Sequence, residues 1–373
     1  MMKEKIADRK INIRELFFVM LSLFLPLEYG ISLLEQSQAA GGFIFLAVAA
    51  VLGVLLMIFY YFWYRNFGNL TLQEIFARTF GKVVAKVILA VYLLAFWAVI
   101  IDFAYALAYV WGAAINIPTM QMLAAALALV ALIAMTGHTV VSRLANFLVF
   151  LALCFLLIGI VLVLARGDMS NLAAYRPAGG LSVFLPLSYG FAITFGLAMF
   201  ALPFLRSVAV TVGEQDFDSG SLKEKKLRNW LIASVLTGAV FLALLMLRNL
   251  IMLGSALPDY DLPLLQTLKL FSLGESFNQT EIFGILLFES IGVVGLAFAF
   301  CSINKLTAEL VPVKSNGSLT VAWAVLTYLA ALVLFAEPQA MTDMLIGCAN
   351  SAVWLAAVII PLITLLTDKI RKH

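Results

Sequence analysis

Ten long apolar stretches constrain the fold of this chain more than any other feature of its sequence. A helix needs roughly 20 apolar residues to cross a bilayer, and such stretches recur along the whole chain. Only 12% of the residues are charged, whereas a soluble domain carries about 25%. We therefore predict a single integral membrane domain over residues 1–373, all-α, with about 10 transmembrane helices. The spans are expected at residues 15–37, 43–64, 83–111, 120–136, 144–165, 181–204, 230–253, 282–304, 319–335 and 344–366.

The basic residues predict how the chain is oriented. If the N-terminus lies in the cytosol and the spans alternate, twenty of the 24 Lys and Arg residues fall in cytosolic segments. Lys and Arg are enriched in cytoplasmic loops of membrane proteins. We therefore expect a multi-pass protein with both termini cytosolic. Its basic residues report topology, not nucleic-acid binding.

The sequence contains no pattern typical of an enzyme. Cys154, Cys301 and Cys348 are scattered singly in apolar segments, without a CxxC motif or a Cys/His ligand set. A Gly-rich phosphate loop and a Ser/His/Asp set are also missing. We expect no enzymatic activity, no metal site and no cofactor.

A seven-residue pattern occurs twice, as FLPLEYG over residues 24–30 and as FLPLSYG over residues 184–190. Proline removes a backbone donor and glycine adds backbone freedom, so each copy is expected to interrupt its helix. The first copy also places a carboxylate, Glu28, in the middle of a span, where charge is costly and usually functional. Because Pro186 lies close to the start of its span, the second interruption is expected nearer residues 190–196.

The spacing of the two copies predicts the architecture. Five spans separate them, so a repeat of that length enters the membrane in the opposite orientation the second time. We predict a LeuT-like 5+5 inverted repeat with broken first and sixth helices. The first repeat covers about residues 11–166 and the second about 181–366.

The loops carry further local signals. Thr71 and Glu74 have the spacing of a capping box, and Gly81 suits a helix end, so a short inner amphipathic helix is expected between them. Residues 205–229 read as a polar connector, and residues 264–273 as a surface helix in an outer loop. His138 is expected to be solvated in an inner loop.

Several short motifs follow one another along the chain. They are, in order, ELFF at residues 15–18, NLTLQEI at 69–75, FGK at 80–82, FG at 195–196, LPF at 202–204 and ES at 289–290. Together they resemble the spore germination permease-like family, the B-subunits of germinant receptors, within the amino acid–polyamine–organocation superfamily. The sequence departs from the family pattern at two places. Pro26, Leu27 and Glu28 stand where small residues are usual, and Leu197 stands where an acid is usual.

The resemblance implies a LeuT-like permease in the inner membrane of an endospore. It also implies a small germinant ligand such as an amino acid, and partner A- and C-subunits. Contact with membrane lipid follows from the composition, and no nucleic-acid partner is expected.

The two helix breaks provide the candidate ligand site, because unwound backbone offers N–H groups to a carboxylate and C=O groups to an ammonium. Glu28 either pairs with the ligand or is satisfied by hydrogen bonds to a neighbouring helix, and the glycines either line the pocket or let helices pack closely. The candidate residues are Pro26, Leu27, Glu28, Tyr29, Gly30, Tyr189, Gly190, Thr194 and Gly196.

A proton or ion path is predicted along Glu28, Asp102, Glu289 and Ser302. Asp102 shares a helical face with two tyrosines, so it belongs either to a polar path or to an interfacial aromatic cluster. Glu289 and Ser302 enter by resemblance, because the eighth helix supplies ion ligands in some LeuT-like transporters.

Three functions are compatible with these patterns. The first is a receptor-type permease that binds a germinant and signals to partner subunits. The alternative is a proton-coupled amino acid or amine transporter. A third is a scaffold subunit with a vestigial pocket.

Overall fold

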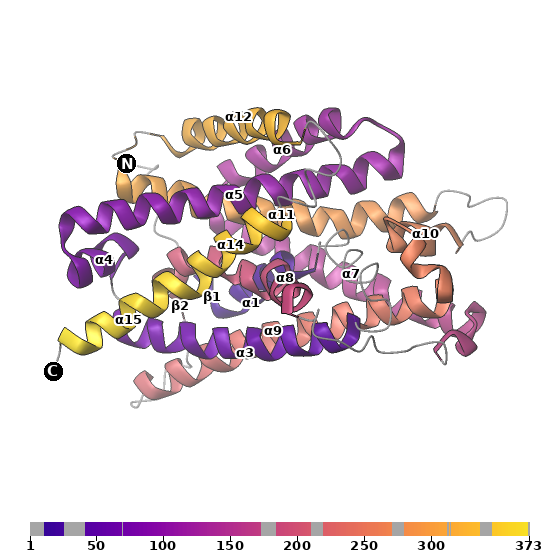
Figure 1. Cartoon of the computed structure of the whole chain (residues 1–373), viewed down its shortest axis with the longest axis horizontal. Helices are drawn as coiled ribbons and strands as arrows, with labels where there is room; N and C mark the ends of the chain where they lie inside the picture. The colour runs from indigo at the N-terminus through magenta and orange to yellow at the C-terminus, as the bar shows by residue number, and fades with distance from the viewer. Residues whose placement is uncertain are drawn as a thin grey trace.

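The chain forms a helical bundle around one central helix. The computed structural model describes residues 11–25, 42–68, 70–172, 184–209, 219–270, 280–311, 313, 315–335 and 345–371. The central helix is α11 (Thr280–Leu310). In its most apolar 18-residue window 89% of the residues are buried inside the protein, whereas the share for the peripheral α12 (Asn316–Leu334) is 17%. Figure 1 shows α4 and the end of α15 at one end of the bundle and α10 at the other. We name these the α4 end and the α10 end.

All ten predicted spans contain helix within these residues. The first-repeat elements are β1 (Ile11–Asn12), α1 (Ile13–Phe24), α3 (Gly42–Phe67), α4 (Leu72–Phe80), α5 (Lys82–Ile115), α6 (Thr119–Met135), α7 (His138–Arg166) and η1 (Met169–Leu172). The second repeat comprises α8 (Phe184–Ile193), η2 (Phe195–Ser207), β2 (Val208–Ala209), α9 (Ser219–Leu253), η3 (Gly254–Asp259), α10 (Pro263–Leu270), α11, α12, η5 (Leu345–Ala349), α14 (Asn350–Val353), η6 (Trp354–Ile359) and α15 (Ile360–Arg371).

Seven helices in the described part of the chain are long and apolar enough to cross a membrane on their own. The other three spans are short for identifiable reasons. The described part of the first span ends with α1, the fourth span is the 17-residue α6, and the sixth is divided into α8 and η2. The protein is therefore a multi-pass membrane protein, and the sixth span, predicted to be broken, is irregular.

The short helix α4 forms as its sequence predicts. The Glu74 N–H donates to Thr71 Oγ1 at 3.2 Å, and the Thr71 N–H donates to Glu74 Oε2 at 2.7 Å, which completes the capping box. Gly81 ends the helix with a φ of +90°, a conformation that side-chain-bearing residues rarely adopt. An ion pair of 3.1 Å between Arg78 and Asp368 fastens α4 to the C-terminal α15.

A two-stranded parallel sheet joins the beginning of the first span to the end of the sixth. Ile11 pairs with Val208 and Asn12 pairs with Ala209. Asn12 also caps α1, because its Oδ1 accepts from the Arg14 N–H at 3.2 Å. One turn into α1, Glu15 forms an ion pair of 3.4 Å with Arg143 of α7.

Three expectations for the loops are corrected. The predicted polar connector over residues 205–229 contains β2 and the start of α9, which begins at Ser219. The predicted outer surface helix is α10, but most of its residues are buried against the bundle, and only Lys269 and Leu270 at its end are exposed. His138 begins α7 and stacks on the Phe204 ring with 4.9 Å between centroids, so it is partly buried and not simply solvated.

Candidate functional site

The sixth span is interrupted at Thr194. The α-helix α8 ends at Ile193, Thr194 has φ −96° and ψ −86°, and a 3-10 helix begins at Phe195. The Thr194 hydroxyl donates to the Gly190 carbonyl at 2.6 Å and so closes the last turn of α8. The interruption lies within residues 190–196, as the sequence predicts.

The described part of the first span ends just before the predicted break. Phe24 is the last residue of α1 and Leu25 is its C-cap. Pro26, Leu27, Glu28, Tyr29 and Gly30 lie outside the described residues. Their candidate roles therefore remain predictions.

The two spans meet at these positions. The Phe24 and Phe195 rings lie edge to face with 5.3 Å between centroids. Gly238 of α9 lies under both rings, where a Cβ would be 3.2 Å from Phe24 Cδ2 and 3.6 Å from Phe195 Cε1. The last turn of α1 thus contacts the first residue after the interruption of the sixth span.

The central helix α11 approaches the same place through a glycine. A Cβ on Gly295 would collide with the carbonyl oxygen of Ser22 and come within 3.0 Å of its carbonyl carbon. Only a residue without a side chain lets the α1 backbone lie this close to α11. Gly295 therefore fixes how deeply the end of α1 sits in the bundle.

The tenth span completes the surroundings of the break. A Cβ on Gly196 would collide with Val353 Cγ1, so η2 packs directly on α14. The α14 segment is flanked by the π-helical turns η5 and η6. Such π-bulges are frequent at functional sites because they leave backbone groups without regular partners.

A polar cluster links this irregular span to the second sequence repeat. The Ser188 hydroxyl accepts from Trp354 Nε1 at 2.8 Å and from Asn350 Nδ2 at 3.2 Å. Ser188 occupies the position of Glu28 in the repeated motif. Asn350 and Trp354 are missing from the sequence-based candidates, although an amide in the middle of an apolar span is a recognisable signal.

The remaining candidates lie in different places. Gly190 is buried in α8, and the Tyr189 side chain lies outside the described part of the structure. Asp102 of α5 is 6% exposed, and its Oδ1 has no hydrogen-bond partner among the described residues. Its neighbour Tyr105 stacks on Phe335 at 4.1 Å, as an aromatic cluster would.

Glu289 and Ser302 both belong to α11 and both are buried. The Ser302 hydroxyl lies 2.6 Å from the Phe200 carbonyl oxygen of η2 and 2.9 Å from that of Phe298. Ser302 therefore links α11 to the 3-10 half of the sixth span through a hydrogen bond. At about 1.5 Å per residue, Glu289 lies about 20 Å away along the helix, so the two do not share one site.

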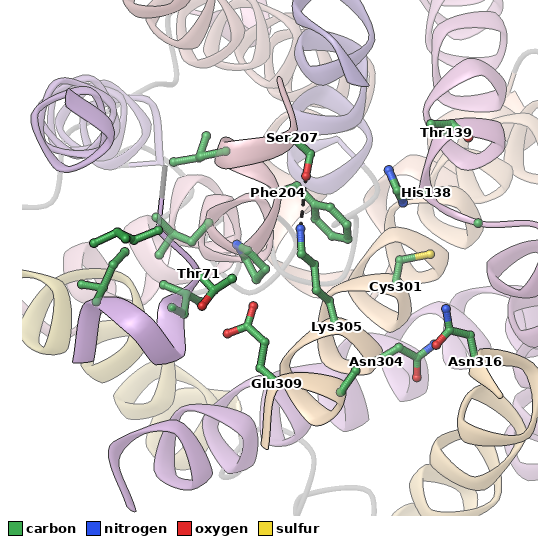
Figure 2. Close-up of a pocket in the computed structure, with 18 of the residues that line it drawn as sticks. Thr71, His138, Thr139, Phe204, Ser207, Cys301, Asn304, Lys305, Glu309 and Asn316 are labelled. Atoms are coloured by element: carbon green, nitrogen blue, oxygen red, sulfur yellow. Dashed lines mark hydrogen bonds between the residues drawn. The ribbon is translucent and has the colours of Figure 1, made fainter. Parts of the chain in front are cut away.

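The described residues also line a cavity of about 500 Å³, which lies at the α4 end and not at the break of the sixth span. Figure 2 shows Lys305 pointing from α11 toward Ser207 and Phe204, with Glu309 and Thr71 on one side and His138 on the other. No group of three or more His, Cys, Asp or Glu side chains suited to a metal occurs in the described residues.

Solved structures with the same fold are transporters. The Mhp1 transporter of the nucleobase-cation-symport-1 family, closed with bromovinylhydantoin bound, superposes with a TM-score of 0.65 at 14% identity over 94% of this chain and 76% of that one. A mutant manganese transporter from Eremococcus coleocola gives 0.63 at 16% identity over 97% and 79%. At these identities the likeness shows the fold alone: a LeuT-like inverted repeat with broken first and sixth helices.

Sequence comparison gives the family. No curated protein sequence matches the chain. The model of one family, described as spore germination protein, matches residues 10–340, which is most of the sequence. The chain therefore belongs to the spore germination protein family and has a transporter fold.

Proposed function

We propose that this permease is the B-subunit of a germinant receptor and binds a small nutrient where its first and sixth spans are interrupted. The observation that carries the proposal is the contact between Phe24 and Phe195 at the two helix ends. Helix ends leave backbone N–H and C=O groups without intrahelical partners. These groups suit a carboxylate and an ammonium, so an amino acid is the ligand class we propose.

In this proposal Gly190, Thr194 and Gly196 provide the sixth-span side of the pocket, together with Tyr189. The segment from Pro26 to Gly30 provides the first-span side. Glu28 pairs with the ligand ammonium. Glu28→Gln removes the charge and nearly keeps the volume, so the response to ligand should weaken or lose its pH dependence. An unchanged dose–response curve and pH profile would remove Glu28 from the mechanism.

Proton-coupled transport of an amino acid or amine is the alternative. It is favoured by the buried Asp102, whose Oδ1 has no hydrogen-bond partner among the described residues. A buried carboxyl group of this kind can take up and release a proton along the path proposed through Glu28, Asp102, Glu289 and Ser302.

Reconstitution in liposomes separates the two functions. A receptor should be stabilised thermally by an amino acid without accumulating the labelled compound under a proton gradient. Accumulation that is lost in Asp102→Asn would establish the transporter instead. If no amino acid changes the thermal stability and no flux occurs, the pocket is vestigial and both functions are wrong.

The receptor function includes partners and a location. We propose A- and C-type receptor subunits as partners, the spore inner membrane as the location, and cytosolic termini. Co-purification of the full chain with both subunits from spore membranes would support this. Purification of the chain without either subunit would contradict it.

A further inference from the structure

The cavity at the α4 end does not include the break of the sixth span in its lining. It is lined by residues 202–205 and Ser207 of η2 but not by Thr194 or Gly196. A 3-10 helix rises about 2 Å per residue, so Leu202 lies about 16 Å along η2 from Thr194. Its volume of about 500 Å³ falls within the range of small-molecule pockets, roughly 300–1,000 Å³.

The walls of this cavity come from both repeats. The first repeat contributes the end of α3, the start of α4 and the turn between α6 and α7, and the second contributes η2, α11 and α12. A solute bound here would therefore contact the 3-10 half of the sixth span and the central helix at the same time.

The charged groups of the cavity lie on α11. Lys305 Nζ donates to Ser207 Oγ at 3.3 Å and lies 4.5 Å from the centroid of the Phe204 ring. One helical turn further, Glu309 Oε2 accepts from the Gln73 N–H at 3.0 Å. Residues four apart lie on one face of a helix, so the cavity presents a cation and an anion side by side to a ligand.

Asn304 adds an independent observation. It lines the cavity and is only 7% exposed. Its Nδ2 donates to Thr320 Oγ1 at 2.7 Å, but its buried Oδ1 has no hydrogen-bond partner among the described residues. Buried acceptors are rarely left without a donor, so a donor beyond the described residues is expected at this position.

We propose that this cavity is a second solute site, which takes a small zwitterion with an apolar side chain. The carboxylate binds at Lys305, the ammonium binds at Glu309, and the apolar part packs on the Trp63 and Phe67 rings that line the wall. Because the bound solute contacts η2 and α11 together, occupancy holds the second half of the broken span in place.

The test counts bound solute. The full chain in lipid nanodiscs is dialysed to equilibrium against each radiolabelled standard L-amino acid at millimolar concentration. The variants are Lys305→Met for the cavity and Thr194→Val for the break, with Lys225→Met, an exposed residue of α9 outside the cavity, as the matched control. Lys305→Arg keeps the charge and tests whether the loss in Lys305→Met arises from misfolding.

We expect Lys305→Met to lower the amino-acid affinity of one class of site by roughly tenfold or more, the size expected for a lost hydrogen bond to a charged group. Lys305→Arg and Lys225→Met should retain that class, and so should Thr194→Val. The corresponding amine and carboxylic acid, each lacking one charge, should compete weakly.

The inference does not require solute binding at the breaks, and the two variants separate the sites. Loss of binding in Lys305→Met alone supports the cavity and contradicts the break site, whereas loss in Thr194→Val alone does the reverse. The cavity proposal is overturned if Lys305→Met binds every amino acid as the unmodified chain does, or if no amino acid binds at all.

Discussion

Replacing Gly295 by alanine should loosen the end of α1 from α11. The added Cβ would collide with the Ser22 carbonyl oxygen and lie 3.0 Å from the carbonyl carbon and 3.4 Å from the Leu23 nitrogen. All three are backbone atoms, so no side chain can rotate away and the helices must separate. Such overpacking costs about 1–3 kcal/mol, while alanine gains about 1 kcal/mol of helix propensity over glycine.

Gly159→Ala is the matched control, because a Cβ there meets nothing within 4 Å. The propensity gain is common to both variants, so the difference in free energy of unfolding isolates the steric cost of about 1–3 kcal/mol. In thermal unfolding of the purified protein, Gly295→Ala should melt about 1–4 °C below Gly159→Ala, since an unfolding entropy of about 2.1 cal/mol/K per residue over 373 residues gives about 1.3 °C per kcal/mol. Equal melting temperatures would refute the close approach of α1 to α11.

Three further substitutions test neighbouring features by the same unfolding measurement. Ser188→Ala should lower the free energy of unfolding by about 1–3 kcal/mol, because it leaves the Trp354 indole N–H without an acceptor. The same substitution in a Trp354→Phe background should lower it clearly less. Gly81→Ala should cost about 1–3 kcal/mol, since its φ of +90° strains any side chain. Gly196→Ala should destabilise through its clash with Val353, and in a double-mutant cycle Val353→Ala should recover about 0.5–3 kcal/mol of that loss. Strictly additive costs in this cycle would contradict the packing of η2 on α14.

Local signals in the sequence were sufficient for much of the fold. The apolar stretches predicted where the spans lie because membrane helices must be apolar over their whole length. Thr71 and Glu74 predicted the start of α4 because a capping box needs only residues three apart. The repeated motif predicted that the sixth span is interrupted, and residues 190–196 predicted where.

The partners of the break could not be predicted in the same way. Ser188 binds Asn350 and Trp354, which lie more than 160 residues away in the sequence, and no local sequence pattern links positions that far apart. His138 was assigned to a solvated loop because its stacking partner Phe204 comes from another span. The cavity at the α4 end is likewise made of segments from both repeats that the sequence does not place together.

The pairing of β1 with β2 has a mechanical consequence. Ile11 and Asn12 immediately precede α1, and Val208 and Ala209 immediately follow η2. Backbone hydrogen bonds therefore yoke the near half of one interrupted span to the far half of the other. We therefore expect these two half-spans to move together relative to α11, since the pairing depends on backbone groups and not on the side chains of the strands.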